Sequence, residues 1–177
     1  VIIFARSKEK ALKVFPYLEE EEHLEIVLGD ISEPICYDGD IDYVIHGASP
    51  TSSKYFVSHP VETIGAAVDG TRYVLELAKQ KQVKGVVYLS SLEVYGTPAE
   101  DAGMITEKDY GYIEPLSVRS SYSEGKRIVE CLCASYAKEY DVPVKVARLS
   151  QTFGAGVAYD DGRVFAEFAR CAIEGKN

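Results

Sequence analysis

Short apolar runs alternate along the chain with longer segments in which apolar residues recur every three or four positions. A continuous run rich in Val and Ile predicts a buried strand, and the wider spacing predicts a helix with one buried face. We expect strands at residues 1–5, 24–28, 41–46, 85–90 and 143–148, and helices at 8–18, 60–80, 120–140 and 161–174. Pro60 suits the first turn of the longest helix, and Gly175 is placed to end the last one.

The longest of these helices has the clearest apolar stripe. Val61, Ile64, Val68, Leu75 and Ala78 are spaced to lie on one buried face. Continuous apolar strands separated by such helices predict a parallel sheet with helices on both faces, which is an α/β fold. Ligands bind beyond the carboxyl ends of the strands in sheets of this kind. The polar residues that follow the strands are therefore the first candidates for a functional site.

Composition limits the functions that fit. The chain has 177 residues, of which 46% are hydrophobic, and this suffices for one domain with a real core. A net charge of -9 fits nucleic acid poorly, and no apolar run is long enough to cross a bilayer. We find no secretory signal pattern, so we expect a cytoplasmic protein with neither nucleic-acid nor membrane partners. The four cysteines match neither a zinc site nor a disulfide framework, and no metal is expected.

Three residues carry the candidate chemistry. Ser91 stands at the carboxyl end of the fourth predicted strand, and Tyr122 and Lys126 lie four residues apart on one face of a predicted helix. A nearby ammonium favours the phenolate, so we expect Lys126 to lower the pKa of Tyr122. A hydroxyl, an acidified tyrosine and a lysine suit an enzyme that takes a proton from an alcohol while hydride leaves for a nicotinamide.

In this order, the segments resemble the extended short-chain dehydrogenase/reductase family of NAD-dependent epimerases and dehydratases, over nearly the whole chain. The resemblance implies a Rossmann-like, doubly wound sheet, with Ser91, Tyr122 and Lys126 as the catalytic set. Residues 44–49 look like the family's strand beside the dinucleotide, and residues 148–156 look like its stretch near the sugar nucleotide. Members that decarboxylate UDP-glucuronate look closest. These members share with this chain the sequence Ser-Pro at 49–50, the Ser-x-Glu-Val-Tyr-Gly-like sequence around Glu93, Glu-Gly-Lys-Arg at 124–127, Thr-Phe-Gly at 152–154 and Asp-Gly-Arg-Val at 161–164.

The chain departs from the family at both ends. The glycine-rich loop and the strand before it are absent, so by resemblance Val1 begins the family's second strand. Without the first strand the sheet would be split and would expose two unpaired edges. We therefore expect a further N-terminal segment in the working protein. Residues 1–177 are expected to be a single dinucleotide-binding domain, in which 150–177 begin the substrate-binding part of a longer chain.

The resemblance also places the cofactor, which would be NAD or NADP. Arg6 stands where NAD-dependent members carry an acid, and a guanidinium there suits the 2′-phosphate of NADP, although it could be an ordinary surface residue. Asp30 could contact the adenine edge or merely form a turn. His46 is expected to be packed or hydrogen-bonded rather than to act as a base. The implied cofactor contacts are Arg6, Asp30, Ile31, His46, Gly47, Ala48, Ser49, Ser90, Tyr122 and Lys126.

The implied substrate is a UDP- or dTDP-linked sugar. Its C4 hydroxyl would be oxidised to a transient 4-keto group, followed by epimerisation, decarboxylation or elimination, with Glu93 as the acid or base of the middle step. Leu92 replaces the acid that many 4,6-dehydratases carry, so decarboxylation or epimerisation is favoured over dehydration. The implied substrate contacts are Thr51, Arg119, Gln151 and Arg163. Arg148 is a further candidate partner for a diphosphate or carboxylate.

Two other functions stay open. One is an NADP-dependent carbonyl reductase of the same superfamily, which Arg6 would suit. The other is a non-catalytic dinucleotide-binding protein that kept the fold. In either case, helices 60–80 and 120–140 carry enough apolar surface to permit the homodimer that is usual in the family.

Overall fold

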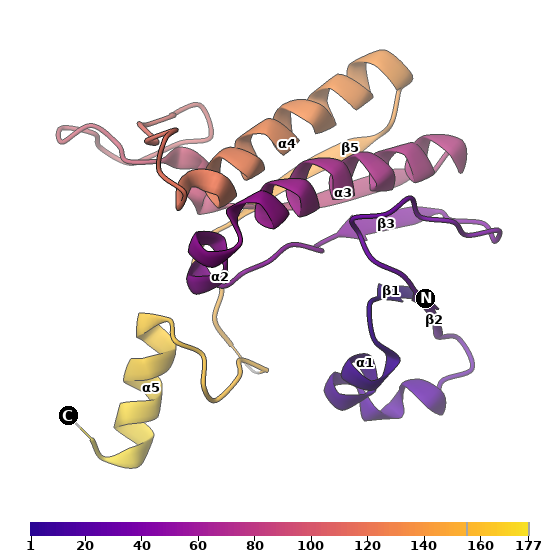
Figure 1. The fold of residues 1–177 in the computed structure, drawn as a ribbon, viewed down its shortest axis with the longest axis horizontal. Coiled ribbons are helices and arrows are strands. Elements are labelled where there is room, and N and C mark those ends of the chain that lie inside the picture. Colours follow the sequence, from indigo (N-terminus) through magenta and orange to yellow (C-terminus); the bar gives the residue numbers. More distant parts are fainter. Residues whose placement is uncertain (155, 177) are drawn as a thin grey trace.

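The computed structural model describes residues 1–154 and 156–176, and its parallel strands form two separate sheets (Figure 1). One sheet has the order β1-β2 and the other β3-β4-β5. The α/β class is therefore confirmed. In chain order the elements are β1 (Ile2–Ala5), α1 (Lys8–Val14), the 3-10 helix η1 (Pro16–Glu19), β2 (Glu25–Leu28), β3 (Tyr43–His46), α2 (Ser53–Ser58), α3 (Pro60–Gln80), β4 (Gly85–Ser91), the 3-10 helix η2 (Leu92–Tyr95), α4 (Ser120–Tyr140), β5 (Val144–Leu149) and α5 (Val164–Glu174).

The three-stranded sheet holds the core. Strand β4 pairs in parallel with β3 on one side and with β5 on the other. Because side chains alternate along a strand, Val86 and Tyr88 face α3 and α4, where both are almost fully buried. Tyr43 and Ile45, one residue out of phase with the buried His46, are exposed. Among the described residues, helices thus cover one face of this sheet, the face under α3 and α4 (Figure 1).

The two sheets do not pair with each other among the described residues. Strand β1 pairs only with β2, from Ile2 opposite Glu25 to Ala5 opposite Leu28. Strand β3 pairs only with β4. In the part of the chain that the structure describes, β1 and β3 therefore each keep one unpaired edge. The ends of β1, β2 and β3 nevertheless lie close enough to line a common cavity.

Two helices differ from the prediction. The helix expected over residues 8–18 stops at Val14, and Pro16 begins the separate 3-10 helix η1, because a proline disfavours helical backbone in the residue before it. In α3, Val61 is 76% exposed and Ile64 is half exposed, so the predicted apolar face begins too early. The buried positions of α3 start at Thr63 and continue through Ala67, Thr71, Leu75 and Ala78.

Helix α4 packs along α3. Gly125 permits a close approach, since a Cβ placed there would lie 3.3 Å from the Cβ of Ala67. The last helix, α5, lies apart from the other helices (Figure 1). No helix within residues 1–154 and 156–176 is both long and apolar enough to cross a membrane.

The segment between η2 and α4 is fastened at its base. Thr97 and Tyr112 form an isolated antiparallel bridge, with N···O distances of 2.9 and 3.0 Å. From α4, Arg127 donates hydrogen bonds to the carbonyl oxygens of Val94 at 2.8 Å and Gly111 at 2.7 Å. Residues between the two arms of the bridge, such as Met104, reach into solvent.

Candidate functional site

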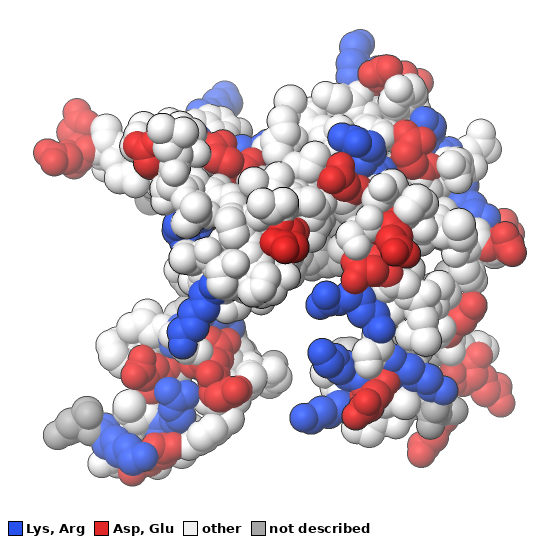
Figure 2. Space-filling model, in the orientation of Figure 1, with Lys and Arg blue, Asp and Glu red and all other residues white. Residues whose placement is uncertain are grey.

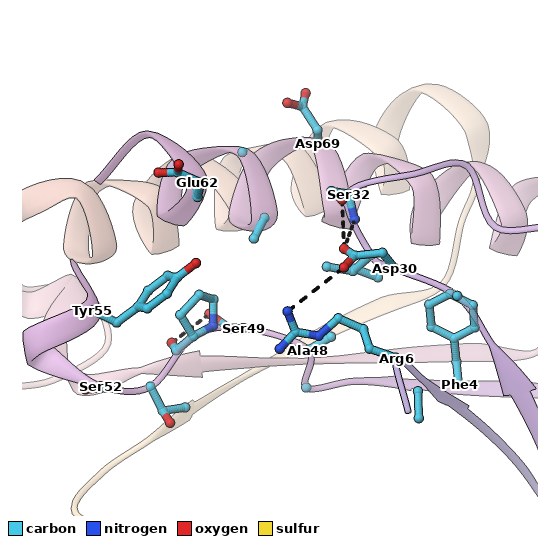
Figure 3. A pocket seen from close by; sticks show the side chains of 18 residues that line it. Phe4, Arg6, Asp30, Ser32, Ala48, Ser49, Ser52, Tyr55, Glu62 and Asp69 are labelled. Carbon is cyan, nitrogen blue, oxygen red and sulfur yellow. Dashed lines mark hydrogen bonds and ion pairs between the residues drawn. The ribbon is translucent and has the colours of Figure 1, made fainter. Parts of the chain in front are cut away.

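A cavity of about 720 Å³ opens at the carboxyl ends of β1, β2 and β3, below α2 and α3 (Figure 3). It brings together seven of the residues that the sequence predicted for cofactor or substrate, from segments far apart in the chain. These are Arg6, Asp30, Ile31, Gly47, Ala48, Ser49 and Thr51. The parallel arrangement explains the gathering, because the carboxyl ends of parallel strands meet at one edge.

Asp30 is held in this cavity by hydrogen bonds from Ser32. Its Oδ1 accepts hydrogen bonds from the backbone N–H of Ser32 at 2.9 Å and from the Ser32 hydroxyl at 2.7 Å. These bonds lower the pKa of Asp30, so it is a carboxylate at neutral pH. Arg6 lies 4.0 Å from the other carboxylate oxygen, and its side chain is 77% exposed. The guanidinium is thus held only loosely and can turn toward an anionic ligand.

Basic side chains gather along the edge of the lobe that β1, β2 and α1 form, facing the hollow beside it (Figure 2). This local distribution contrasts with the net charge of -9. An acidic chain can therefore still offer positive charge near a phosphate-sized ligand.

Sequence reasoning missed the helical wall of the cavity. Tyr55 from α2 and Glu62 and Asp69 from α3 line it (Figure 3). Glu62 and Asp69 are seven residues apart, with the small residues Gly65 and Ala66 between them. This helical spacing of polar and small positions was the signal that could have found the wall.

The predicted catalytic residues lie together where β4 meets α4. Lys126 is buried, and its Nζ donates a hydrogen bond to the carbonyl oxygen of Leu89 at 2.9 Å. The same Nζ lies 4.8 Å from the ring centroid of Tyr88 and 5.6 Å from that of Tyr122. Burial lowers the pKa of Lys126 to about 8. The hydroxyl of Ser91 is near enough to the Tyr122 phenol to lower its pKa.

The pKa of Tyr122 differs from the expectation. It is raised, chiefly because the phenol is partly buried, and the neighbouring Glu93 raises it further. The hydroxyl of Ser91 and the charge of Arg119 lower the pKa of Tyr122. Lys126 does not lower the pKa of Tyr122 in this arrangement, because its ammonium donates to the carbonyl oxygen of Leu89 and its own pKa is lowered by burial.

Glu93 is held by three hydrogen bonds. Both of its oxygens accept from the guanidinium of Arg119, at 2.6 and 3.0 Å, and Ser123 donates to one of them at 2.6 Å. The carboxylate therefore joins η2 to the first turns of α4, beside Tyr122. Arg119, predicted to bind substrate, lines a second cavity of about 420 Å³ together with Glu93.

Two predicted cofactor contacts face away from the large cavity. His46 is 4% exposed and its Nε2 lies 2.9 Å from the Thr71 hydroxyl on α3, which confirms it as a hydrogen-bonded histidine. Ser90 is equally buried and donates to Glu130 of α4 at 2.6 Å. Strand alternation turns both side chains toward the helices, so only their backbone atoms are left for a ligand.

The remaining predicted substrate contacts are dispersed. Gln151 is exposed in the segment after β5, and Arg163 pairs with Asp161 at 2.7 Å at the start of α5. Arg148, a candidate partner of a diphosphate or carboxylate, is engaged instead by Glu130 at 2.7 Å and by the carbonyl oxygen of Glu107 at 2.9 Å. Thr51, in the large cavity, and Arg119 are the predicted substrate residues that line cavities.

Sequence reasoning also missed Phe56. Its ring stacks on that of Tyr122, with centroids 4.3 Å apart. A separation of 66 positions along the chain left no pattern that could have revealed this pair.

Comparisons with known proteins agree with this geometry. Residues 7–177 match the model of the NAD dependent epimerase/dehydratase family. The chain is 34% identical over 155 residues to UDP-glucuronic acid decarboxylase 1 of Xenopus tropicalis, covering 88% of this chain and 36% of that protein. It is 33% identical over 173 residues to UDP-glucuronic acid decarboxylase 3 of Arabidopsis thaliana, covering 98% of this chain and 48% of the relative. The chain thus spans about a third to a half of the length of these relatives.

Solved structures share the fold at lower identity. A UDP-glucuronic acid 4-epimerase from Bacillus cereus, in complex with NAD, matches with a TM-score of 0.74 and 23% identity over 99% of this chain and 56% of its own. RMD from Pseudomonas aeruginosa, complexed with NADPH, matches with a TM-score of 0.73 and 24% identity over 100% of this chain and 64% of its own. These two likenesses establish the architecture.

Proposed function

Because the chain belongs to the NAD dependent epimerase/dehydratase family, we propose that the complete protein oxidises and re-reduces C4 of a UDP- or dTDP-linked sugar. One observation carries the proposal: the buried Lys126 has its Nζ 5.6 Å from the centroid of the Tyr122 ring, and the hydroxyl of Ser91 is near enough to lower the pKa of the same phenol. A phenol, a hydroxyl and an ammonium at one strand end are suited to moving a proton at an alcohol. The chain spans only part of its relatives, so the proposal concerns the complete protein.

The large cavity fits a nicotinamide dinucleotide. Its floor consists of Gly47, Ala48 and Ser49 at the end of β3, where small side chains let a ligand approach the backbone. The Asp30 carboxylate offers acceptors to a ribose or an adenine edge, and Arg6 offers positive charge. When bound, the dinucleotide supplies hydride acceptance and return.

Each catalytic side chain then has a defined task. Ser91 holds the C4 hydroxyl, and Tyr122 as phenolate accepts the proton of that hydroxyl. Lys126 carries the positive charge that stabilises the phenolate when a bound ligand covers the side chain of Tyr122. Since the pKa of Tyr122 is raised, proton removal is expected to become faster as pH rises, until Lys126 loses its charge near its pKa of about 8.

The middle step falls to Glu93. A 4-keto group acidifies C5 and makes a C5 carboxylate a β-keto acid, so decarboxylation or epimerisation follows from the same oxidation. Both oxygens of Glu93 are occupied by Arg119 and Ser123. To act as an acid or a base, Glu93 has to exchange one of these partners for the substrate. We rank decarboxylation first because the relatives reported above are named UDP-glucuronic acid decarboxylases.

Arg6 supports NADP over NAD. Its side chain is 77% exposed and its contact with Asp30 is long, so it is free to bind a 2′-phosphate bidentately. Arg6→Ala is then expected to weaken binding of NADPH and to leave binding of NADH nearly unchanged. Isothermal titration of the complete protein with both dinucleotides measures this, and equal losses for the two would contradict the assignment.

We also propose a homodimer for the complete protein. Val61 and Ile64 on α3 and Ile128 on α4 are large apolar side chains that are 76%, 47% and 51% exposed. Exposed apolar surface on neighbouring helices is typical of an interface. Sedimentation of the complete protein tests this.

The decisive experiment starts from the complete protein. Any bound dinucleotide is extracted and identified by mass, and the enzyme is then incubated with UDP-glucuronate while products are followed by mass and NMR. Release of carbon dioxide with no net change of cofactor is the expected result, and Tyr122→Phe should abolish it. Tyr140→Phe, at the far end of the same helix, is the matched control and should retain activity.

Other outcomes favour the alternatives. Net consumption of NADPH with a carbonyl substrate would indicate a carbonyl reductase, which the exposed Arg6 would suit. A bound dinucleotide without turnover of any nucleotide sugar or carbonyl would indicate a non-catalytic binding protein.

A further inference from the structure

Phe56 is the aromatic side chain that packs face to face on Tyr122. The ring centroids are 4.3 Å apart and the ring planes differ by 10°. Phe56 is 2% exposed and belongs to the largest fully buried side chains of the described residues. Its neighbours on α2 point elsewhere, since Val57 is 52% exposed and Tyr55 lines the large cavity. Helix α2 thus buries one ring, and that ring meets the candidate catalytic tyrosine.

Two further contacts hold Phe56 beside Tyr122. The guanidinium carbon of Arg119 lies 5.1 Å from the centroid of the Phe56 ring. The hydroxyl of Ser121 donates to the backbone carbonyl oxygen of Phe56, at 3.4 Å. Two residues that precede Tyr122, Arg119 at the N-cap of α4 and Ser121 in its first turn, therefore hold α2 in place. Since Arg119 is fixed in turn by Glu93, the stack has little freedom to slide.

We propose that Phe56 is a positioning residue, whose ring holds the Tyr122 phenol toward Ser91 and excludes water from one face of it. The inference rests on the proposed function only where a reaction rate is measured. The ring packing and the ionisation of Tyr122 can be tested without substrate or cofactor.

The same helix ties this role to the ligand cavity. Ser52, which precedes α2, and Tyr55 within it line the cavity, whereas Phe56 contacts Tyr122. Because Tyr55 and Phe56 are adjacent in one short helix, α2 fixes the position of the cavity wall relative to the Tyr122 phenol. A loss of the ring is therefore expected to disturb Tyr122 more than it disturbs dinucleotide binding.

Removal of the ring changes the surroundings of Tyr122 in a defined direction. The groups that face the phenol are Ser91, Glu93, Arg119, Lys126 and Tyr88. Of these groups, Arg119 also contacts the Phe56 ring, and its two hydrogen bonds to Glu93 are expected to keep it in place when that ring is removed. Burial is the largest cause that raises the pKa of Tyr122, so admitting water should lower that pKa. The acidic limb of the pH–rate profile should then move to lower pH, while the rate falls because the phenol is less well oriented.

The test compares three variants of the complete protein. Phe56→Leu removes the ring and keeps the bulk, Phe56→Tyr keeps the ring, and Val57→Ala changes an exposed neighbour on the same helix. The first readout is the carbon-13 NMR titration of the Tyr122 ring, assigned with Tyr122→Phe. The second is the pH profile of kcat for the nucleotide sugar, and the third is the melting temperature.

We expect Phe56→Leu to lower the pKa of Tyr122 and to reduce kcat about tenfold, with the profile shifted to lower pH. Phe56→Tyr and Val57→Ala should keep the wild-type titration. A Phe56→Leu protein that melts earlier but titrates like wild type would overturn the proposal, because its ring would then be only part of the core. If no turnover is found for wild type, the proposed function fails while the NMR titration still decides the role of Phe56.

Discussion

The ion pair between Glu130 and Arg148 provides a quantitative test of how the site is held together. The two side chains are only 13% and 12% exposed. Three N···O contacts join them, at 2.7, 3.0 and 3.2 Å, and Ser90 donates to the same carboxylate at 2.6 Å. Glu130 thus connects α4, which bears Tyr122, to the ends of β4 and β5.

Glu130→Gln keeps the size of the side chain and removes its charge. It leaves the guanidinium of Arg148 largely buried without a counter-charge, and breaking a buried pair in this way costs about 3–5 kcal/mol. Because both side chains keep some exposure to water, we expect the lower end of this range, about 3 kcal/mol. The carboxylate also raises the pKa of Lys126, so the variant should lower that pKa further.

Urea unfolding of the complete protein measures the free energy of unfolding. The control is Asp42→Asn, which breaks a pair of similar length, 2.7 Å to Lys84, whose side chains are 67% and 66% exposed. We expect no measurable loss there, because water screens the pair. The double variant Glu130→Leu with Arg148→Met should recover much of the loss, since no charge is then left unpaired. A loss for Glu130→Gln no larger than that of the control would refute the reasoning.

Two further predictions concern the core and the loop. Burial lowers the pKa of His46 from 6.5 to about 4. The folded protein therefore binds fewer protons than the unfolded chain between these values, and stability falls as the pH drops through them. Between pH 7 and pH 5 the wild-type protein should therefore lose about 2 kcal/mol more free energy of unfolding than the His46→Gln variant does. Urea unfolding of both proteins at both pH values measures this difference, and an equal loss in the two proteins would contradict the prediction. Gly111→Ala would place a Cβ 2.1 Å from the carbonyl oxygen of Thr97, so the bridge to Tyr112 should open. Faster proteolysis between residues 97 and 112 is the expected sign, and unchanged cleavage would argue against it.

The sequence predicted the strands well because each is a continuous apolar run, and a parallel sheet buries such runs. The periodic spacing of apolar residues located the helices, but it did not show which turns of a helix extend beyond the core. Val61 and Ile64 fit the period of α3 yet lie exposed, since no described element covers the first turn of that helix. The six-residue helix α2, with a serine at each end, has too few apolar positions to show a period.

The candidate site was predictable where its residues are neighbours in the chain or follow a strand. Tyr122 and Lys126 share a helix face and Asp30 follows a strand, so local patterns located them, while their roles were inferred together with Ser91 and from the family resemblance. Phe56 and the occupied partners of Glu93 depend on tertiary packing and left no trace in any local pattern. The direction of the Tyr122 pKa was mispredicted for the same reason, because burial cannot be read from a spacing of four residues.

The closure of the 97–112 segment has a consequence for how this chain can vary. The bridge between Thr97 and Tyr112, together with the hold of Arg127 on both arms, isolates the tip from the strand end that carries Ser91. Lengthening a flexible loop raises the entropic cost of closing it only slightly, by about 0.6 kcal/mol of free energy for each doubling of its length. The tip around Met104, 94% exposed, can therefore accept insertions or a fused tag without disturbing the residues behind it. It is a natural place for lineages to diverge and for a label to be attached.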